Sequence, residues 1–465
     1  MKATHLRAFS GLSALCNLIV TYNTPQEPVM PAENIALKST PYWWEAAPVA
    51  PLPEMPLERQ VDVAIVGAGY AGLTAGMTLA RAGRSVAIYD RQHPGEGASS
   101  RNGGITSGNI RLDHATLVKK FGQARADAII LEGKVARQHL YDMLSNEGID
   151  CDFKLVGRFG GALGTNDYER MARQAEHLER TLGVESYAVP QSEQHKYIGT
   201  DFFRGGSVRM DIGGLHPAKL IAELLRVAQT AGAVVHSDTA VETIDREGEG
   251  FTLRTGRGTV KARQVLVCTN GYTDSATPWL RRRIVPVRSR IIATEPLAPE
   301  LISRLMPRRM MLNDTRTLGF YFRLSPDGTR ILFGGRDGST LEDPSKPVAY
   351  LRRNLLEIFP ELESTDITHS WYGNVAMHRD MIPRIFEKKG VHYATGFCGS
   401  GVVWAPWIGR KAAHKLLGSK DEAPSAFDFK PPAPIPLYNG KPWFMPFFMM
   451  KYRMDDRLKM RRAGR

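Results

Sequence analysis

The chain has 465 residues, a net charge of +13, and 43% hydrophobic residues. This length is too great for one simple core and predicts about two domains of an ordinary globular enzyme. No apolar run is long enough to cross a bilayer, and the four scattered cysteines provide no CxxC pair for a metal. We therefore expect a cytoplasmic protein without a metal site.

The positive charge gathers in two clusters. Residues 451–465 hold seven Lys or Arg against two Asp, and Arg281–Arg283 form a second cluster with two further arginines close behind. Solvated basic faces are the simplest interpretation, and contact with a membrane surface or an anionic substrate is the alternative. A nucleic-acid partner is not predicted, because no recognised module interleaves basic and aromatic residues.

The N-terminal segment shows no domain pattern. We expect residues 1–40 to form a disordered extension, in which residues 1–29 precede a second start-like residue, Met30. Residues 31–58 are rich in Pro and Ala around Tyr42-Trp43-Trp44, and adjacent tryptophans are costly to leave in water. This segment is therefore predicted to be an extended arm that its aromatics anchor on the folded domain.

A dinucleotide-binding pattern follows the arm. The apolar run Val61–Val66 predicts a buried parallel strand, and it leads into glycines spaced GxGxxG at 67, 69 and 72. A helix is predicted from 73 to 82, then a strand from 85 to 89 that ends on Asp90, 18 residues past the last glycine. The spacing indicates one βαβ unit that holds FAD or NAD, and the acid disfavours the 2′-phosphate of NADP.

Each residue of this pattern has a physical role. Gly67 permits the tight turn, Gly69 lets a pyrophosphate approach the backbone, and Gly72 lets helix and strand pack closely. The start of the helix directs N–H groups and the positive end of its dipole at the phosphates. Asp90 accepts hydrogen bonds from the ribose hydroxyls of an adenosine.

The rest of the chain predicts a second sheet inserted into the first. Residues 284–350 alternate apolar and polar between Gly, Pro and Asp turns, which is typical of an antiparallel sheet. The predicted fold is α/β, α+β overall: a Rossmann-like domain with a central parallel sheet, and a domain built on a mainly antiparallel sheet. Other strands are expected at 233–236, 239–244, 252–255, 261–269 and 391–395, and helices at 115–147, 166–182, 217–229 and 402–417.

Five features in a fixed order carry a family resemblance. They are the tryptophan arm, the βαβ unit, the loop Gly97-Ala-Ser-Ser-Arg-Asn-Gly-Gly104, the strand end Cys268-Thr-Asn-Gly271 and the turn Gly396-Phe-Cys-Gly-Ser-Gly401. Over about residues 40–450 the chain resembles the FAD-dependent amine and amino-acid oxidases of the glycine, sarcosine and D-amino-acid oxidase group. It looks most like the γ-glutamylputrescine oxidoreductase branch.

The resemblance implies domains and a cofactor. A discontinuous FAD-binding domain is expected from residues 41–112, 205–283 and 370–425, a substrate domain from 113–204 and 284–369, and a basic, aromatic tail from 426–465. The expected contacts with FAD come from the five features and from Val241, whose backbone would meet the adenine. They are Gly67, Ala68, Gly69, Tyr70, Ala71, Gly72, Asp90, Arg91, Ala98, Ser99, Ser100, Arg101, Asn102, Gly103, Gly104, Val241, Thr269, Asn270, Gly271, Gly399, Ser400, Gly401 and Val402.

The implied chemistry is oxidation of a carbon–nitrogen bond. A neutral primary or secondary amine, an N-substituted amino acid or a polyamine derivative would be converted to an imine, which water hydrolyses. Tyr321 and Trp404 are candidate walls of the substrate site, and Arg323 and His378 are candidate polar contacts or a general base. The competing interpretations are sheet core for Tyr321, a surface ion pair for Arg323 and a structural hydrogen bond for His378.

Three departures from the family bear on the chemistry. No cysteine lies in residues 371–377 and no histidine follows Ser99-Ser100, so we predict non-covalent FAD. Val402-Val403 stands where sarcosine oxidases place a carboxylate-binding lysine, which makes sarcosine a poor substrate. Residues 330–336 hold no lysine that would activate oxygen, so oxygen as acceptor is in doubt.

Several alternatives follow from the sequence. Oxygen is the expected acceptor, and the rival is a dehydrogenase of the same fold that passes electrons to a quinone or carrier protein docked by the basic tail. The tail is expected to pack as a helix on the protein's own surface, with peripheral membrane contact as the alternative. A non-catalytic nucleotide- or nucleic-acid-binding protein is the most remote interpretation. The oligomeric state is left open.

Overall fold

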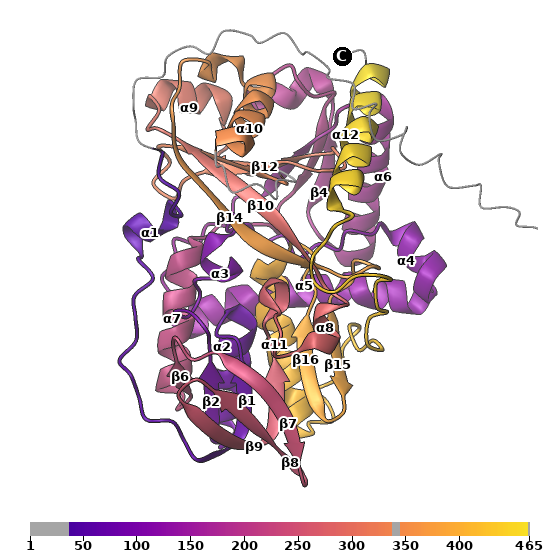
Figure 1. Cartoon of the computed structure of the whole chain (residues 1–465). Helices are drawn as coiled ribbons and strands as arrows, with labels where there is room; N and C mark the ends of the chain where they lie inside the picture. The colour runs from indigo at the N-terminus through magenta and orange to yellow at the C-terminus, as the bar shows by residue number, and fades with distance from the viewer. Residues whose placement is uncertain (1–36, 337–344, 464–465) are drawn as a thin grey trace, which may run out of the picture. The chain divides into compact units, whose positions relative to one another are not determined.

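The strand that opens the dinucleotide pattern lies at the centre of a mainly parallel sheet. The computed structural model describes residues 37–336 and 345–463 (Figure 1). The strand order is β15-β16-β9-β1-β2-β6, and a hairpin of β7 and β8 extends from β9. The strands are β1 (Gln60–Val66), β2 (Val86–Tyr89), β6 (Val234–His236), β7 (Val241–Glu247), β8 (Gly250–Thr255), β9 (Gly258–Val267), β15 (Arg384–Lys388) and β16 (Val391–Thr395).

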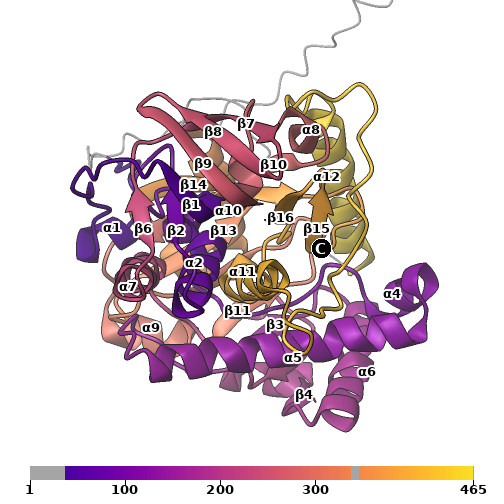
Figure 2. The same ribbon diagram turned by 90° about the horizontal axis from the view of Figure 1, so that it is seen from below.

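Four pairings in this sheet are parallel, as predicted. β1 pairs with β2 and β9, β2 with β6, and β9 with β16. Helices α2 (Tyr70–Arg81), α7 (Pro217–Thr230) and α11 (Gly401–Leu417) lie side by side against it (Figure 2). At Gly409 a Cβ would lie 2.2 Å from the carbonyl oxygen of Ala71, so glycine permits α11 and α2 to touch backbone to backbone. The C-terminal segment therefore returns to cover the nucleotide-binding helix.

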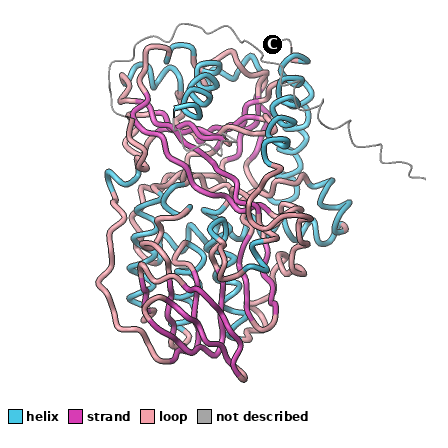
Figure 3. The backbone as a smooth tube through the Cα atoms, in the orientation of Figure 1, coloured by secondary structure: helices cyan, strands magenta, loops and turns pink. Residues whose placement is uncertain are grey.

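A second sheet carries the remaining strands (Figure 3). Its order is β14-β10-β13-β12-β11-β3-β5-β4, and every pairing is antiparallel except that of β11 with β3. This confirms the predicted second sheet. Its strands are β3 (Arg158–Gly161), β4 (Ser186–Val189), β5 (Gly206–Arg209), β10 (Val285–Thr294), β11 (Met311–Asp314), β12 (Tyr321–Leu324), β13 (Ile331–Gly335) and β14 (Ile367–Met377).

Helices form the remaining described elements. One continuous helix is predicted from 115 to 147, whereas the structure has two, because Gly122 adopts a φ of +82° that interrupts the helix. The segment 284–350, predicted as sheet alone, also contains α9 and the start of α10. The helices are α1 (Trp43–Ala46), α3 (Ala98–Arg101), α4 (His114–Phe121), α5 (Gln123–Asn146), α6 (Thr165–Leu182), α8 (Pro278–Arg281), α9 (Pro299–Leu305), α10 (Ser345–Ile358) and α12 (Met445–Arg462), with 3₁₀ turns at Gln191–Lys196, Asn270–Tyr272 and Pro360–Leu362.

The aromatic arm is anchored as predicted. Trp43 is fully buried and packs with Trp371 and Ala218, while its indole N–H donates to the carbonyl of Asn102 at 2.9 Å. The part of the arm from residue 37 onward thus lies on the folded unit, and residues 1–36, including most of the expected extension, lie outside the described residues. In the described ranges, every helix is too short or too polar to cross a bilayer.

The predicted domain boundaries stay a prediction. Residues 37–465 form one compact unit. β5 and β14 belong to the second sheet, although the expected FAD-binding segments 205–283 and 370–425 overlap them. Strand patterns alone do not tell which of two sheets a strand joins, because both sheets bury apolar side chains.

Candidate functional site

A cavity of about 460 Å³ extends from the first βα turn to the second sheet. Its lining combines the β1–α2 turn, the loop from 95 to 111, the end of β9 with residues 268–274, parts of β11 to β13, and the turn before α11. These segments are far apart in the sequence, and both sheets contribute. The cavity is therefore long enough to combine a nucleotide-binding end with a second, chemically different end.

The βα turn is built as the glycine spacing predicts. Gly67 has a φ of +105°, a conformation that favours glycine. A Cβ at Gly72 would lie 1.9 Å from the carbonyl oxygen of Gly67, so any side chain there would push helix α2 off the turn. Gly69 is the N-cap of α2 and supplies no side-chain acceptor, while the N–H of Tyr70 donates to the Ser99 hydroxyl at 3.1 Å. A phosphate could therefore approach this turn and accept hydrogen bonds from the other N–H groups of the first helical turn.

Asp90 is tied to the same turn. Its carboxylate accepts hydrogen bonds from the backbone N–H of Ala68 at 2.8 Å and of Gln92 at 3.1 Å. Burial raises the pKa of Asp90, and the two backbone donors act against that rise. A carboxylate has about four lone-pair sites, so it retains capacity for ribose hydroxyls.

Three tryptophans hold the loop that starts at Gly97. Trp43 donates to the carbonyl of Asn102 at 2.9 Å, Trp44 to the Ser100 hydroxyl at 2.9 Å, and Trp371 to the carbonyl of Arg101 at 3.0 Å. The arm and β14 thus fix the short helix α3 from two sides. Asn102 returns hydrogen bonds to the carbonyls of Ala98 and Ser99 and accepts one from Gly104, which closes the loop on itself.

Two glycines at the end of this loop, Gly103 and Gly104, pack so closely against neighbouring residues that no side chain would fit. A Cβ at Gly103 would lie 2.7 Å from the ring of Tyr321, and one at Gly104 would lie 2.1 Å from the carbonyl oxygen of Leu215. Gly104 also has a φ of +65°. The backbone here approaches the second sheet more closely than any side chain would allow, and it forms one wall of the cavity.

The turn before α11 forms the opposite wall. Cys398 and Gly399 have φ values of +52° and +100°, and α11 begins at Gly401 without a side-chain cap. The Asn270 side chain accepts a hydrogen bond from the N–H of Gly396 at 2.9 Å, which joins this turn to the end of β9. Free N–H groups at this helix start could stabilise negative charge on a bound group.

These features fit FAD, and the family comparison decides the assignment. Residues 62–415 match the family model described as FAD dependent oxidoreductase, DAO. The chain belongs to this FAD-dependent oxidoreductase family. When bound, FAD accepts the two electrons and the hydrogen of an oxidised substrate. The turn residues 67–72 with Asp90 would hold its adenosine and pyrophosphate, and the two walls at 103–104 and 399–402 would hold its far end.

Relatives of similar length match most of the chain. The chain is 32% identical over 420 residues to a probable oxidoreductase OrdL from Rhizobium meliloti (strain 1021), covering 88% of this chain and 94% of the relative. It is 28% identical to the γ-glutamylputrescine oxidoreductase of Escherichia coli (strain K12), covering 85% and 93%. The crystal structure of glycine oxidase from Geobacillus kaustophilus matches with a TM-score of 0.68 at 22% identity, covering 82% and 99%. The last comparison supports the oxidoreductase fold.

Most of the predicted cofactor residues of this oxidoreductase lie together. Four of them do not line the cavity: Ala68 and Ser100 act through hydrogen bonds to Asp90 and Trp44, while Gly72 and Gly271 permit close backbone packing. The predicted residues that line it are Gly67, Gly69, Tyr70, Ala71, Asp90, Arg91, Ala98, Ser99, Arg101, Asn102, Gly103, Gly104, Val241, Thr269, Asn270, Gly399, Ser400, Gly401 and Val402.

One of the four catalytic candidates lines the cavity. This candidate is Tyr321, whose hydroxyl lies 3.1 Å from the hydroxyl of Ser289. Burial raises the pKa of Tyr321. Arg323 donates to the carbonyl of Leu215 at 2.7 Å, Trp404 to that of Asn109 at 3.2 Å, and His378 contacts the carbonyl of Ile382 at 3.0 Å. These three side chains are buried in structural contacts and do not line the cavity, so their predicted catalytic roles have no support from this placement.

Sequence reasoning missed a group of polar lining residues. Arg111, Arg158 and Arg336 line the cavity, as do Asn313 and Arg316. Isolated arginines at a loop and at strand ends follow no motif, so nothing in the sequence distinguished them from surface charges. In the part of the chain that the structure describes, no three His, Cys, Asp or Glu side chains gather as a metal site.

Proposed function

We propose that this oxidoreductase oxidises the C–N bond of a primary or secondary amine that carries a carboxylate, with oxygen as acceptor. The amine loses a proton from nitrogen and a hydride equivalent from carbon. The two electrons would reach oxygen by way of the bound flavin and yield peroxide, and water would hydrolyse the imine to a carbonyl compound and a smaller amine or ammonia. The single observation that carries the substrate class is the pair of arginines, Arg111 and Arg336.

In the part of the chain that the structure describes, neither arginine has an anionic partner. Arg336 donates one long hydrogen bond, 3.3 Å, to the carbonyl of Leu318, and its Nε is buried without a hydrogen-bond partner. Within residues 37–336 and 345–463, the guanidinium of Arg111 has neither a hydrogen bond nor an ion pair. Burial, and then the neighbouring charge of Arg111, lowers the pKa of Arg336 to about 9, so the Arg336 guanidinium stays charged at pH 7. A carboxylate would satisfy both by charge-assisted hydrogen bonds.

The same charges favour the reactive form of the amine. A cation near a substrate ammonium lowers the pKa of that ammonium, so binding would release the proton that oxidation requires. No histidine is found among the described lining residues, and the raised pKa of Tyr321 keeps its phenol neutral. The arginines, and not a side-chain base, would therefore prepare the amine. Polyamines with several positive charges fit this wall poorly.

The test is anaerobic bleaching of the flavin absorption. Amino acids should bleach the purified yellow protein, whereas the corresponding amines without the carboxylate should fail at the same concentration. Arg336→Leu should raise KM at least tenfold, and the charge-preserving variant Arg336→Lys should recover part of that loss. Equal bleaching by amines without a carboxylate would overturn the substrate class. A protein that binds FAD and is bleached by no amine would overturn the reaction.

Non-covalent attachment of FAD is also part of the proposal. Cys268 and Cys398 line the cavity, and burial raises the pKa of the Cys398 thiol to about 11. This thiol also lies 3.0 Å from the carbonyl of Gly396 as a donor. A protonated thiol is a poor nucleophile toward a flavin. Acid precipitation should release all yellow colour into the supernatant, and colour in the pellet would contradict the proposal.

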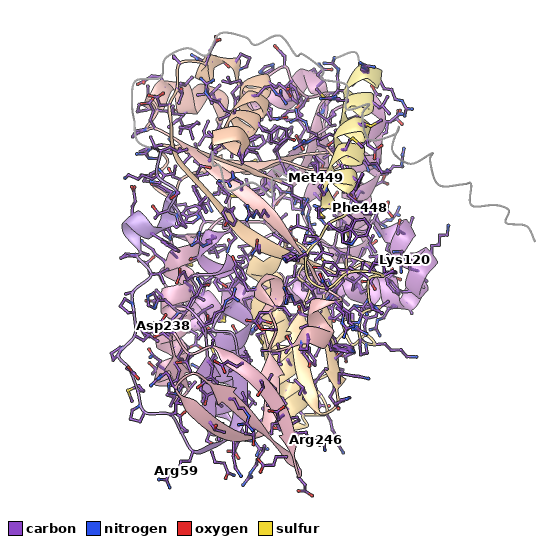
Figure 4. All side chains as sticks on the ribbon, in the orientation of Figure 1. Arg59, Lys120, Asp238, Arg246, Phe448 and Met449 are labelled. Atoms are coloured by element: carbon purple, nitrogen blue, oxygen red, sulfur yellow. The ribbon has the colours of Figure 1, made fainter. Side chains whose placement is uncertain are left out.

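A second candidate acceptor is a membrane quinone, and α12 favours it. One face of α12 is held inward: Asp456 accepts from the N–H groups of Thr317 at 2.6 Å and Leu318 at 3.2 Å. The other face of α12 exposes large apolar side chains. Two adjacent residues that Figure 4 labels show the contrast between the faces: Phe448 is 47% exposed, whereas Met449 is only 3% exposed. Exposed cations accompany them, which suits an anionic bilayer surface. The exposed side chains include Phe447, Phe448, Met450, Met454 and Leu458 with Lys451, Arg457, Arg461 and Arg462.

Two measurements separate the acceptors. One mole of peroxide per mole of amine under air supports oxygen. Reduction of a soluble quinone without peroxide, together with sedimentation on vesicles containing anionic phospholipid, supports the membrane quinone. Phe447→Ser combined with Met454→Ser should then abolish sedimentation and leave amine-dependent bleaching intact.

A further inference from the structure

Arg158 forms a second cationic position on the cavity wall. It begins β3, opposite Met311 in the parallel pairing with β11, and it lines the cavity together with Asn313. In the described ranges, with residues 1–36, 337–344 and 464–465 left aside, its guanidinium has neither a hydrogen bond nor an ion pair. Its N–H donors are therefore available to a ligand, because no described residue of the chain accepts from them.

Asp211, the acid whose charge acts on Arg158, is already paired with two other arginines. Asp211 accepts from Arg209 at 3.0 Å and 2.8 Å, and forms an ion pair with Arg137 at 2.5 Å. Arg137 and Arg209 also hold the cavity loop, through hydrogen bonds to the carbonyl of Ser107 and the side chain of Asn109. Two guanidinium groups, those of Arg137 and Arg209, therefore share this one carboxylate. The excess positive charge lies at Arg158, whose pKa falls to about 9 through burial and the charge of Arg209.

This position is separate from the pair Arg111 and Arg336. The charges that act on Arg158 are those of Arg209, Asp211 and Arg137, whereas Arg336 responds to Arg111, Tyr321 and Cys398. Each position thus has its own electrostatic surroundings, although both line one cavity. Asn313 adds a buried side-chain oxygen without a hydrogen-bond partner, an acceptor for a substrate N–H.

We propose that Arg158 binds a second carboxylate, so that the preferred substrate is an amine bearing two carboxylates. An acidic amino acid satisfies this requirement, as does a secondary amine that joins two carboxylate-bearing carbons. The inference rests on the proposed function, in which Arg111 and Arg336 bind the first carboxylate. A compound with one carboxylate would leave the half-buried Arg158 unpaired in the cavity, and an unpaired charge that is partly removed from water is unfavourable.

The first experiment measures binding without turnover. Succinate and glutarate, and the monocarboxylates acetate and butyrate, are titrated into the oxidised holoenzyme while the flavin absorption is followed. The dicarboxylates should bind at least tenfold more tightly. Arg158→Gln should lower dicarboxylate affinity about 10- to 100-fold, as expected for one charge-assisted pair, and leave monocarboxylate affinity within about twofold. Arg158→Lys should recover part of the loss.

The matched control is Arg308→Gln, which removes an exposed arginine stacked on Tyr197, 4.4 Å from its ring and away from the cavity lining. This control should bind both classes of acid like the parent. Equal affinities for mono- and dicarboxylates in the parent, or an equal loss of both in Arg158→Gln, would overturn the inference.

A second experiment separates this inference from the proposed function. Anaerobic bleaching is compared for aspartate, glutamate and alanine, and for a secondary amine with two carboxymethyl groups. Arg158→Gln should raise KM for the dicarboxylates and change kcat little, with alanine unaffected. Bleaching by alanine alone would overturn the dicarboxylate preference and leave the amine oxidation standing. Dicarboxylate binding without bleaching by any amine would overturn the proposed reaction and leave the Arg158 subsite standing.

Discussion

Removal of the Trp43 side chain should loosen FAD by releasing the loop from 98 to 102. Trp43 is fully buried against Trp371 and His216, and its indole donates to the carbonyl of Asn102 at 2.9 Å. Truncation of a buried tryptophan to alanine costs about 3–5 kcal/mol, and the lost hydrogen bond accounts for roughly 1 kcal/mol of it. Trp43→Ala should therefore lower the free energy of unfolding by about 3–5 kcal/mol, and Trp43→Phe by about 1–2 kcal/mol.

The effect on FAD follows from the same contact. The substitution should also favour an open form of the loop from 98 to 102 that does not bind FAD. If the loop is destabilised by at least about 1.4 kcal/mol relative to this open form, the affinity for FAD falls tenfold or more. Urea unfolding of the apoprotein measures the first quantity, and titration of FAD fluorescence measures the second. Trp279→Ala is the matched control, since Trp279 packs under Arg283, 3.9 Å from its guanidinium, and does not line the cavity. It should lower stability without changing FAD affinity, and Trp43→Ala with parent-like FAD affinity would refute the reasoning.

Three further outcomes are expected. Gly72→Ala should abolish flavin binding, because its Cβ would lie 1.9 Å from the carbonyl of Gly67, whereas Gly256→Ala, with only a carboxylate oxygen 3.8 Å away, should retain a full flavin-to-protein ratio. Tyr321→Phe should cost about 1 kcal/mol of stability for its lost hydrogen bond, and it should leave the alkaline side of the kcat profile unchanged, since a neutral phenol is no base. Burial lowers the pKa of His378 to about 4, so the unfolded chain binds more protons between pH 6.5 and 4. The free energy of unfolding should therefore decrease by on the order of 3 kcal/mol as the pH is lowered from 6.5 to 4. Thermal melts of His378→Gln should show a smaller decrease over the same pH range.

The glycine turn and the loop after it could be predicted from the sequence because their geometry depends on residues close together along the chain. Gly67, Gly72 and Asp90 act within one βαβ unit, where backbone geometry dictates which residue types fit. The sequence also predicted both sheets, since each strand shows its own apolar pattern. The prediction of one continuous helix was wrong at residue 122, where a glycine with positive φ interrupts the helical pattern.

Arg323 illustrates why the catalytic end resisted prediction. It follows Tyr321 by two positions in β12 and so lies on the same face of the strand. Its guanidinium nevertheless reaches the carbonyls of Leu215 and Gly104 and holds the loop in place. A charged residue beside a candidate site can serve the scaffold or the substrate, and only its hydrogen-bond partners tell which.

By itself, the sequence predicted a cofactor-binding framework of a glycine turn, an acid after the second strand and two further glycine-rich segments, because each is a short stretch whose chemistry follows from neighbouring residues. Only the tertiary structure brought together Arg111 from a loop, Arg158 from β3 and Arg336 from the residue that follows β13, so that all three line one cavity. It also showed that Asp211 is already paired with Arg137 and Arg209, an observation on which the proposed substrate contacts rest. Charge balance in a cavity depends on distances across the fold, and those distances are absent from the order of residues along the chain.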